Sequence, residues 1–137
     1  SIFKIVDLDE PWAFLNVAQG ETLSNKLVRA GRAMNAGVYF VTQSSGDVSK
    51  ESLKNNIGLK FAFRSTDTNE IKQTLEFFGL DSEDENNQKR LRDLENGQCL
   101  MQDLYGRVGV VQIHPVFVEL LHAFDTRPPI KSEVDLE

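Results

Sequence analysis

Two adjacent acids follow a short apolar segment near the start of the chain. Ile2–Val6 is apolar and β-branched, which predicts a buried strand, and Asp9 and Glu10 follow closely. Open α/β sheets bind ligands outside the carboxyl ends of their strands. There, one carboxylate can order a magnesium ion while its neighbour orients or deprotonates an attacking water. Asp9 and Glu10 are therefore candidates for phosphoryl-transfer chemistry, with solubilising strand caps as the plainer interpretation.

A polar pair ends the next predicted strand. Val38–Val41 is a second buried apolar run, and Thr42 and Gln43 follow it. A glutamine at a strand tip can hold the attacking water and sense the γ-phosphate of a nucleotide. Taken alone, Gln43 is better interpreted as a strand-end amide that bonds to a loop backbone.

Two arginines lie between these strands. Apolar residues recur at helical spacing over Glu21–Asn35, and Arg29 and Arg32 fall late in that predicted helix. The guanidinium group is planar and permanently charged, so it is suited to binding phosphate. The alternative is structural, because the carboxyl end of any helix favours cations.

The order of these three features resembles the type IV secretion and conjugative-transfer ATPases (TraC-like) of the HerA–FtsK branch of P-loop NTPases. The resemblance rests on the acid pair Asp9-Glu10, the segment Arg29-Ala30-Gly31-Arg32 and the strand end Thr42-Gln43, with Asn96-Gly97 before a hairpin as a weaker match. It spans roughly residues 2–113, and the first fifty residues are its specific part.

The resemblance implies a set of site roles. Asp9 would be the magnesium-ordering acid and Glu10 the catalytic glutamate of the Walker B strand, with ATP and Mg²⁺ as cofactors. Gln43 would be the sensor, and Thr42 would contact the nucleotide beside it. Arg32, with Arg29 as second choice, would be an arginine finger that reaches a nucleotide, in its own subunit or in the neighbouring subunit of a hexameric ring.

It also implies partners and a location. These are other subunits of a ring-shaped homo-oligomer and the channel or coupling proteins of a type IV secretion system. The protein would be cytoplasmic, at the inner face of the cell membrane. The net charge of −6 and the pI near 4.9 argue against this segment gripping DNA by itself, because phosphate contacts need clustered Lys and Arg. DNA could therefore be bound only through other regions.

One departure from the family matters. No Gly-x-x-x-x-Gly-Lys-Ser/Thr occurs in the chain, so the Walker A loop that cradles the phosphates is absent. In the family this loop lies upstream of the acid pair. The expectation is therefore the carboxy-terminal part of an ATPase motor domain, inactive alone and active in the full-length protein.

Two other function classes compete with this interpretation. Asp7 and Asp9 after an apolar strand also resemble the haloacid-dehalogenase phosphatases, with Asp7 as nucleophile and Asp9 as acid/base. Against this, Glu10-Pro11 replaces the usual Gly-Thr or Gly-Val, and no later strand ends in an acid pair. The third candidate is a non-enzymatic α/β interaction module.

The alternation of strands and helices predicts the fold class. It is α/β, a partial RecA-like P-loop NTPase domain with a mostly parallel sheet flanked by helices and an antiparallel hairpin at one edge. Residues 1–126 would form the domain and 127–137 a flexible tail. Further strands are expected at 59–63, 99–103 and 108–113, and helices at 49–55, 67–78, 81–94 and from Pro115 onward.

Some residues are assigned structural roles only. Thr22 or Ser24 could cap the helix 21–35, and Gly37 could end it. The acidic run 81–85 lacks the ligand spacing of a calcium loop and fits a helix start. Cys99 is the single cysteine and is expected to be a small buried hydrophobe. His114 and His122 lack partners at metal-ligand spacing.

Overall fold

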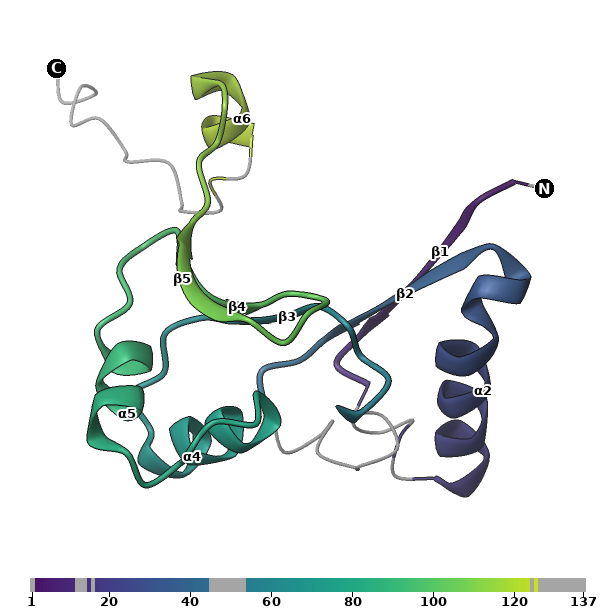
Figure 1. Ribbon diagram of the computed structural model, residues 1–137. Helices are drawn as coiled ribbons and strands as arrows, with labels where there is room; N and C mark the ends of the chain where they lie inside the picture. Colours follow the sequence, from purple (N-terminus) through teal and green to yellow (C-terminus); the bar gives the residue numbers. More distant parts are fainter. Residues whose placement is uncertain (1, 12–14, 16, 45–53, 124, 126–137) are drawn as a thin grey trace, which may run out of the picture.

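The computed structural model describes residues 2–11, 15, 17–44, 54–123 and 125, and the following account concerns those residues. They form the α/β architecture that the sequence predicts (Figure 1). In chain order the elements are β1 (Lys4–Asp9), α2 (Ala18–Met34), β2 (Ala36–Val41), β3 (Lys60–Ala62), α4 (Thr68–Phe77), α5 (Glu85–Arg92), β4 (Gln98–Gln102), β5 (Val108–Gln112) and α6 (Val118–Ala123).

The described strands form two sheets. β1 and β2 pair in parallel, in a register that runs from Lys4 beside Ala36 to Asp9 beside Val41. β3, β4 and β5 form an antiparallel sheet in that order, which includes the predicted hairpin. β2 and β3 each have a single strand neighbour in the described part of the chain. The first two strands, β1 and β2, thus pair in parallel, and the later strands, β3 to β5, pair antiparallel.

Helix α2 connects the parallel strands and differs from the prediction at both ends. It begins at Ala18, so Thr22 lies inside the helix, where its hydroxyl donates to the Ala18 carbonyl oxygen at 2.9 Å. Ser24 is fully buried within the helix, so neither residue is the cap. Asn35, not Gly37, takes the left-handed conformation after the helix, with φ of 51°, since asparagine tolerates that region better than most residues.

The main core lies between α4, α5 and β4, and the two helices lie within those predicted at 67–78 and 81–94. Asp67 caps α4, since its carboxylate accepts a hydrogen bond from the Glu70 amide at 2.9 Å. The buried face of α4 meets apolar residues of α5 and β4. The cluster consists of Ile71, Leu75, Phe78, Leu91, Leu94 and Leu100. Cys99 is buried beside it, as predicted, and burial raises the pKa of its thiol.

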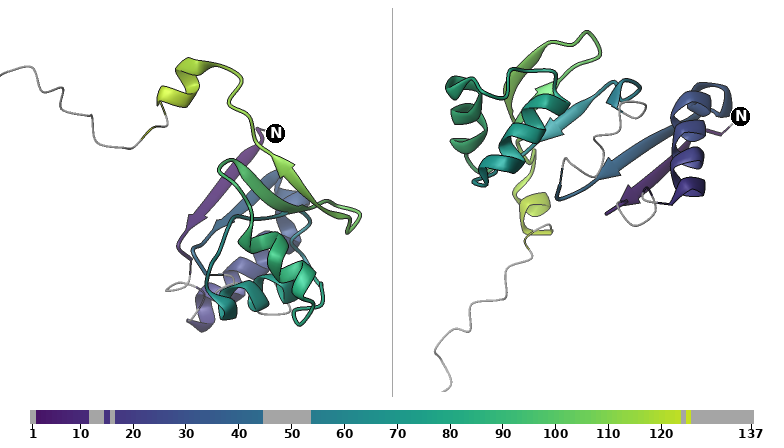
Figure 2. Two further views of the ribbon diagram at one scale, coloured as in Figure 1. Left: turned by 90° about the vertical axis from the view of Figure 1, so that its left-hand side faces the viewer. Right: turned by 90° about the horizontal axis from the view of Figure 1, so that it is seen from below.

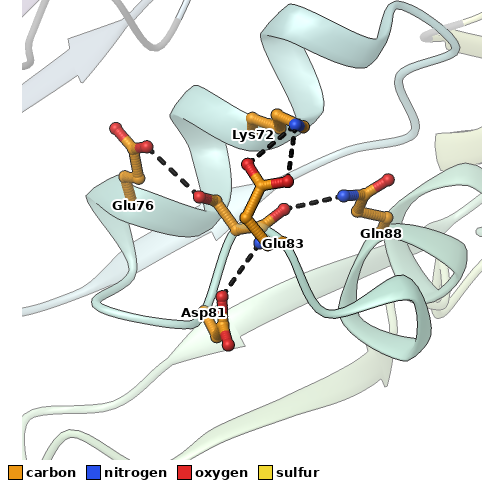
Figure 3. Close-up of polar contacts among 6 residues, drawn as sticks. Lys72, Glu76, Asp81, Glu83 and Gln88 are labelled. Carbon is orange, nitrogen blue, oxygen red and sulfur yellow. Dashed lines mark hydrogen bonds and ion pairs between the residues drawn. The ribbon is translucent and has the colours of Figure 1, made fainter.

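The acidic run forms a polar connection between α4 and α5 (Figure 3). Glu83 pairs with Lys72 of α4 at 2.7 Å, and the Ser82 hydroxyl donates to Glu76 of the same helix at 3.2 Å. Asp84 caps α5 by accepting from the Asn86 amide at 2.8 Å. The predicted helix start is confirmed, and its acids also satisfy specific donors.

Burial is uneven, and the prediction of a buried first strand is wrong in this structure. Phe3 and Ile5 are each 61% exposed, because α2 covers only the opposite face, where Val6 and Leu8 are half-buried. β2 alternates in the same way, with Tyr39 exposed. The apolar faces of both strands would need cover from another segment or chain.

The end of the described chain also differs from expectation. The last helix, α6, begins at Val118, three residues after Pro115. None of its residues is buried, and it stands apart from the sheets in each view (Figure 2). Most of the helix expected at 49–55 and all of the tail 127–137 lie outside the described residues.

One glycine fixes how closely α2 approaches β2. A Cβ added at Gly31 would lie 2.8 Å from the carbonyl oxygen of Ala36, at the start of β2. Cβ atoms do not come that close to backbone, so a side chain at position 31 would push the helix away from the strand. The glycine of the Arg29–Arg32 segment is therefore required for packing.

We expect Gly31→Ala to lower the free energy of unfolding by about 1–3 kcal/mol, because a clash with backbone cannot be relieved by a rotamer change. This loss should outweigh the advantage of about 1 kcal/mol that alanine has over glycine within a helix. Gly109→Ala in β5 is the control, since nothing lies within 4 Å of an added Cβ there. Urea denaturation followed by circular dichroism measures both. A Gly31→Ala variant as stable as the parent would contradict the packing argument.

Candidate functional site

The acid pair and the Thr-Gln pair meet at one edge of the parallel sheet. Asp9 lies beside Val41 in the strand register, and the Glu10 amide donates to the Val41 carbonyl oxygen at 2.8 Å. Thr42 and Gln43 follow directly, so both pairs stand at the carboxyl ends of neighbouring strands. Strands in a sheet are spaced by about 4.8 Å. The structure therefore brings together four of the predicted site residues.

Glu10 has an unusual backbone. Its φ is 49°, in the left-handed region, which costs a residue with a Cβ roughly 1–2 kcal/mol. The hydrogen bond from its amide to Val41 holds this conformation. Strained positions of this kind cluster at functional sites, where the surrounding structure enforces them.

The Thr42 hydroxyl closes a compact turn around Gln43 by bonding to the backbone of Ser44. The Thr42 hydroxyl donates to the Ser44 carbonyl oxygen at 3.1 Å and accepts from the Ser44 amide at 3.2 Å. Gln43 lies between them with an exposed side chain. Thr42 is thus engaged in shaping the turn, and Gln43 is presented at the strand edge.

The edge suits a magnesium ion that is bound together with a nucleotide. Asp9 is exposed there, and Mg²⁺ in such sites takes one or two carboxylates, several waters and the substrate phosphates. The described residues contain no group of three or more His, Cys, Asp or Glu that could hold a metal without a nucleotide. His114 and His122 belong to no such group. The donor set fits a metal that arrives with phosphates.

Arg29 does not join this edge. α2 ends at the opposite edge, where the Lys4 amide donates to the Asn35 carbonyl oxygen at 3.0 Å. Arg29 lies about 9 Å from that end along the helix, whereas Asp9 lies about 17 Å along β1 from Lys4. Arg29 is also exposed, on the face of α2 opposite the buried Ser24 and Gly31. Position 32 lies in the last turn of α2, and its side chain is outside the described residues.

A shallow hollow of about 430 Å³ runs along this outer face of α2. It is lined by Thr22, Asn25, Lys26, Arg29 and Ala30, all from one helix. Neither the acid pair nor Gln43 contributes to it. The hollow therefore marks the cationic face of the helix and is separate from the strand-edge site.

Sequence reasoning missed two residues of this region. Ser44 shapes the turn, and its hydroxyl donates to Glu70 of α4 at 3.4 Å. Ser44 begins a run of turn-forming residues, 44–47, so the sequence predicts a loop there but assigns Ser44 no role at the site. No local signal connects it to Glu70, because they are 26 residues apart.

Comparison with known proteins decides the family. Residues 1–124 match the family model described as AAA-like domain. The chain belongs to the AAA-like domain family. Within the part of this AAA-like domain that the structure describes, no helix is long and apolar enough to cross a membrane.

A curated relative and a solved structure are also similar to the chain. The uncharacterized protein YddE of Bacillus subtilis (strain 168) is 34% identical over 119 residues, which cover 87% of this AAA-like domain chain and 14% of that protein. The genome packaging NTPase B204 of Sulfolobus turreted icosahedral virus 2, solved in complex with ATP-gammaS, matches with a TM-score of 0.63 at 14% identity. That match covers 81% of this chain and 52% of the viral protein, and it shows a shared fold.

The strain at Glu10 can be measured in this AAA-like domain. We expect Glu10→Gly to raise the free energy of unfolding by about 1 kcal/mol, because glycine adopts positive φ without steric cost. Asn35→Gly, at φ of 51°, is the matched control and should gain less, since asparagine already tolerates this region. Chemical denaturation of both variants gives the comparison. Equal gains at the two positions, or a loss at position 10, would argue against strain at Glu10.

Proposed function

We propose that this chain is the carboxy-terminal part of an ATP-hydrolysing motor domain within a longer protein. The observation that carries the proposal is the parallel register of β1 and β2, which sets Asp9 and Glu10 beside Thr42 and Gln43. Membership of the AAA-like family supports nucleotide hydrolysis as the chemistry. The chain spans only 14% of its curated relative, so the activity is proposed for the whole protein.

Each polar group at the edge has a distinct role in this proposal. Asp9 would help to hold the magnesium ion that accompanies ATP. The ion would neutralise charge on the phosphates. Glu10 orients the attacking water and accepts its proton. Gln43 contacts the water or the γ-phosphate, and Thr42 stabilises the turn that presents Gln43. The Walker A loop of the intact domain would bind the phosphates, a role that no segment of this chain fills.

The arginines act on a neighbouring subunit in this proposal. Arg29 is exposed on the outer face of α2 and displaced toward the sheet edge opposite Glu10. A side chain placed there is available to another chain and poorly placed for its own acids. This geometry fits a ring-shaped assembly in which Arg32 or Arg29 stabilises the transition state in the active site of the neighbouring subunit.

We further propose that the motor serves conjugative DNA transfer or a related type IV secretion process. The support is the sequence resemblance of the first fifty residues to that branch. Channel or coupling proteins at the inner face of the membrane would then be partners of the full-length protein. The acidic net charge assigns any DNA contact to other regions.

The phosphatase alternative fits the geometry less well. Asp7 lies inside β1, beside Tyr39, two residues before the strand end, so a nucleophile there would lie farther than Asp9 from a ligand bound at that end. The family assignment also favours the motor. A non-enzymatic interaction module would share the fold and differ only in lacking turnover.

Glu10→Gln in the full-length protein should preserve ATP binding and slow hydrolysis by about two or more powers of ten, because water activation is lost while the phosphate cradle is intact. Steady-state phosphate release and nucleotide-binding titrations measure the two effects. The isolated chain of 137 residues serves as a negative control and should release no phosphate above buffer. Full activity in Glu10→Gln would remove Glu10 from the mechanism.

Mixing experiments test whether an arginine acts across subunits. Arg32→Ala and Glu10→Gln proteins should each be inactive alone and partly active when co-assembled, because some interfaces then pair an intact arginine with an intact glutamate. The same mixture made with Arg29→Ala decides between the two arginines. Arg90→Ala, on the exposed side of α5, should be as active as the parent. Mixtures that co-assemble and stay inactive would place the arginine in its own subunit or in a helix-capping role.

A further inference from the structure

The turn that carries Gln43 is tied to a distant helix. Thr42 and Ser44 bond to each other across Gln43, and the Ser44 hydroxyl donates to Glu70 Oε2 at 3.4 Å. The exposed Gln43 side chain makes no hydrogen bond of its own to any described residue. Its position therefore depends on the residues on either side, and Ser44 connects them to α4.

Glu70 occupies a firmly held site on that helix. It lies in the first turn of α4, and its amide donates to the capping carboxylate of Asp67 at 2.9 Å. The next residue, Ile71, is completely buried in the main core. A negative charge is also favoured at the amino end of a helix. The Glu70 carboxylate thus offers Ser44 a charged acceptor on a rigid element.

A second contact connects α4 to the same strand. Leu15 is 1% exposed, and both Phe40 of β2 and Phe77 of α4 pack against it. The helix is therefore connected to β2 indirectly through Leu15, which both contact, and by a hydrogen bond from Ser44, just beyond the carboxyl end of the strand. Together these contacts restrict movement of the turn relative to α4.

We propose that Glu70 is a positioning residue for the ATP hydrolysis assigned to this domain: through Ser44 it holds the turn so that Gln43 stays at the strand edge beside Glu10. The inference rests on the proposed function. Glu70 acts through the turn and does not touch the nucleotide. It also connects the antiparallel half of the chain to the reacting edge, since α4 belongs to the core of that half.

Steady-state ATP hydrolysis by the full-length protein tests this role. Ser44→Ala and Glu70→Ala should each lower kcat about three- to tenfold with KM unchanged. Each variant loses the hydrogen bond between Ser44 and the charged Glu70, so Gln43 is held less well when the transition state forms. The double variant should be no slower than the slower single variant, because both remove the same contact. Glu70→Gln keeps an acceptor oxygen and should retain most of the activity.

The same helix offers matched controls. Ser82 donates to Glu76 of α4 at 3.2 Å, a serine–glutamate bond of the same kind beside the α5 cap. Ser82→Ala and Glu76→Ala should leave kcat unchanged. Three results would overturn the proposal. The first is an equal loss of kcat in these controls, and the second is a double variant of Ser44 and Glu70 whose loss of kcat is the product of the two single losses. The third is a rise in KM with kcat constant in Ser44→Ala and Glu70→Ala.

A second measurement separates this inference from the proposed function. Hydrogen–deuterium exchange of the full-length protein, read at the Ser44 amide, should speed up about three- to tenfold in Glu70→Ala and stay unchanged in Glu76→Ala. A parent protein that hydrolyses no ATP would refute the proposed function. The exchange comparison would still decide whether Glu70 holds the turn of Gln43 through Ser44. Unchanged exchange in Glu70→Ala would show that Glu70 does not hold the turn, whatever the hydrolysis assay shows.

Discussion

The parallel pairing of β1 and β2 is the constraint on which the candidate site depends. Backbone hydrogen bonds continue it beyond both strands, from Lys4 to Asn35 at one edge and from Glu10 to Val41 at the other. A slip of one residue would move every side chain of β1 to the other face. Asp9 would then face α2, and Glu10 would no longer stand beside the turn of Gln43. The register thus converts two separate sequence motifs into one chemical edge.

The sequence was sufficient wherever local signals agree with the fold. Helix α4 lies within the predicted helix 67–78, Asp67 is its cap, and the helical spacing of Ile71 and Leu75 matches its buried face. Asn96-Gly97 and Tyr105-Gly106 form turns around the predicted hairpin, with positive φ at both glycines. Helix capping, helical periodicity and turn chemistry are all encoded within a few residues. They can therefore be read without knowledge of the tertiary structure.

The sequence was insufficient where the outcome depends on distant partners. Phe3 and Ile5 look like core residues, but burial requires a covering surface, and α2 covers only the other side of their strand. The bond between Ser44 and Glu70 joins positions far apart in the chain, so no motif indicates it. The adjacency of Asp9 to Gln43 could be predicted because parallel strands align their carboxyl ends. The direction in which Arg29 points could not, because it requires the buried face of α2 to be known.

The two halves of the chain divide the chemistry unevenly. The parallel half holds the acids, the glutamine and the arginines, whereas the antiparallel half contributes a firm support through α4. Acids at one edge and a cation on the outer face of α2 make opposite surfaces of the same unit complementary in charge. In the proposed ring, this arrangement would let the arginine of one subunit approach the acids of the next.

The concentration of buried side chains between Ile71 and Leu100 has a consequence for how the chain opens. Segments with few buried contacts unfold locally at lower free energy than segments that share a packed core. The antiparallel half should therefore behave as one cooperative unit, while the strands of the reacting edge open more readily. Small rearrangements of Glu10 and Gln43 during a catalytic cycle would then leave the main core intact. The architecture thus separates the strands that carry the site, which open at low free energy, from the antiparallel core, which stays folded.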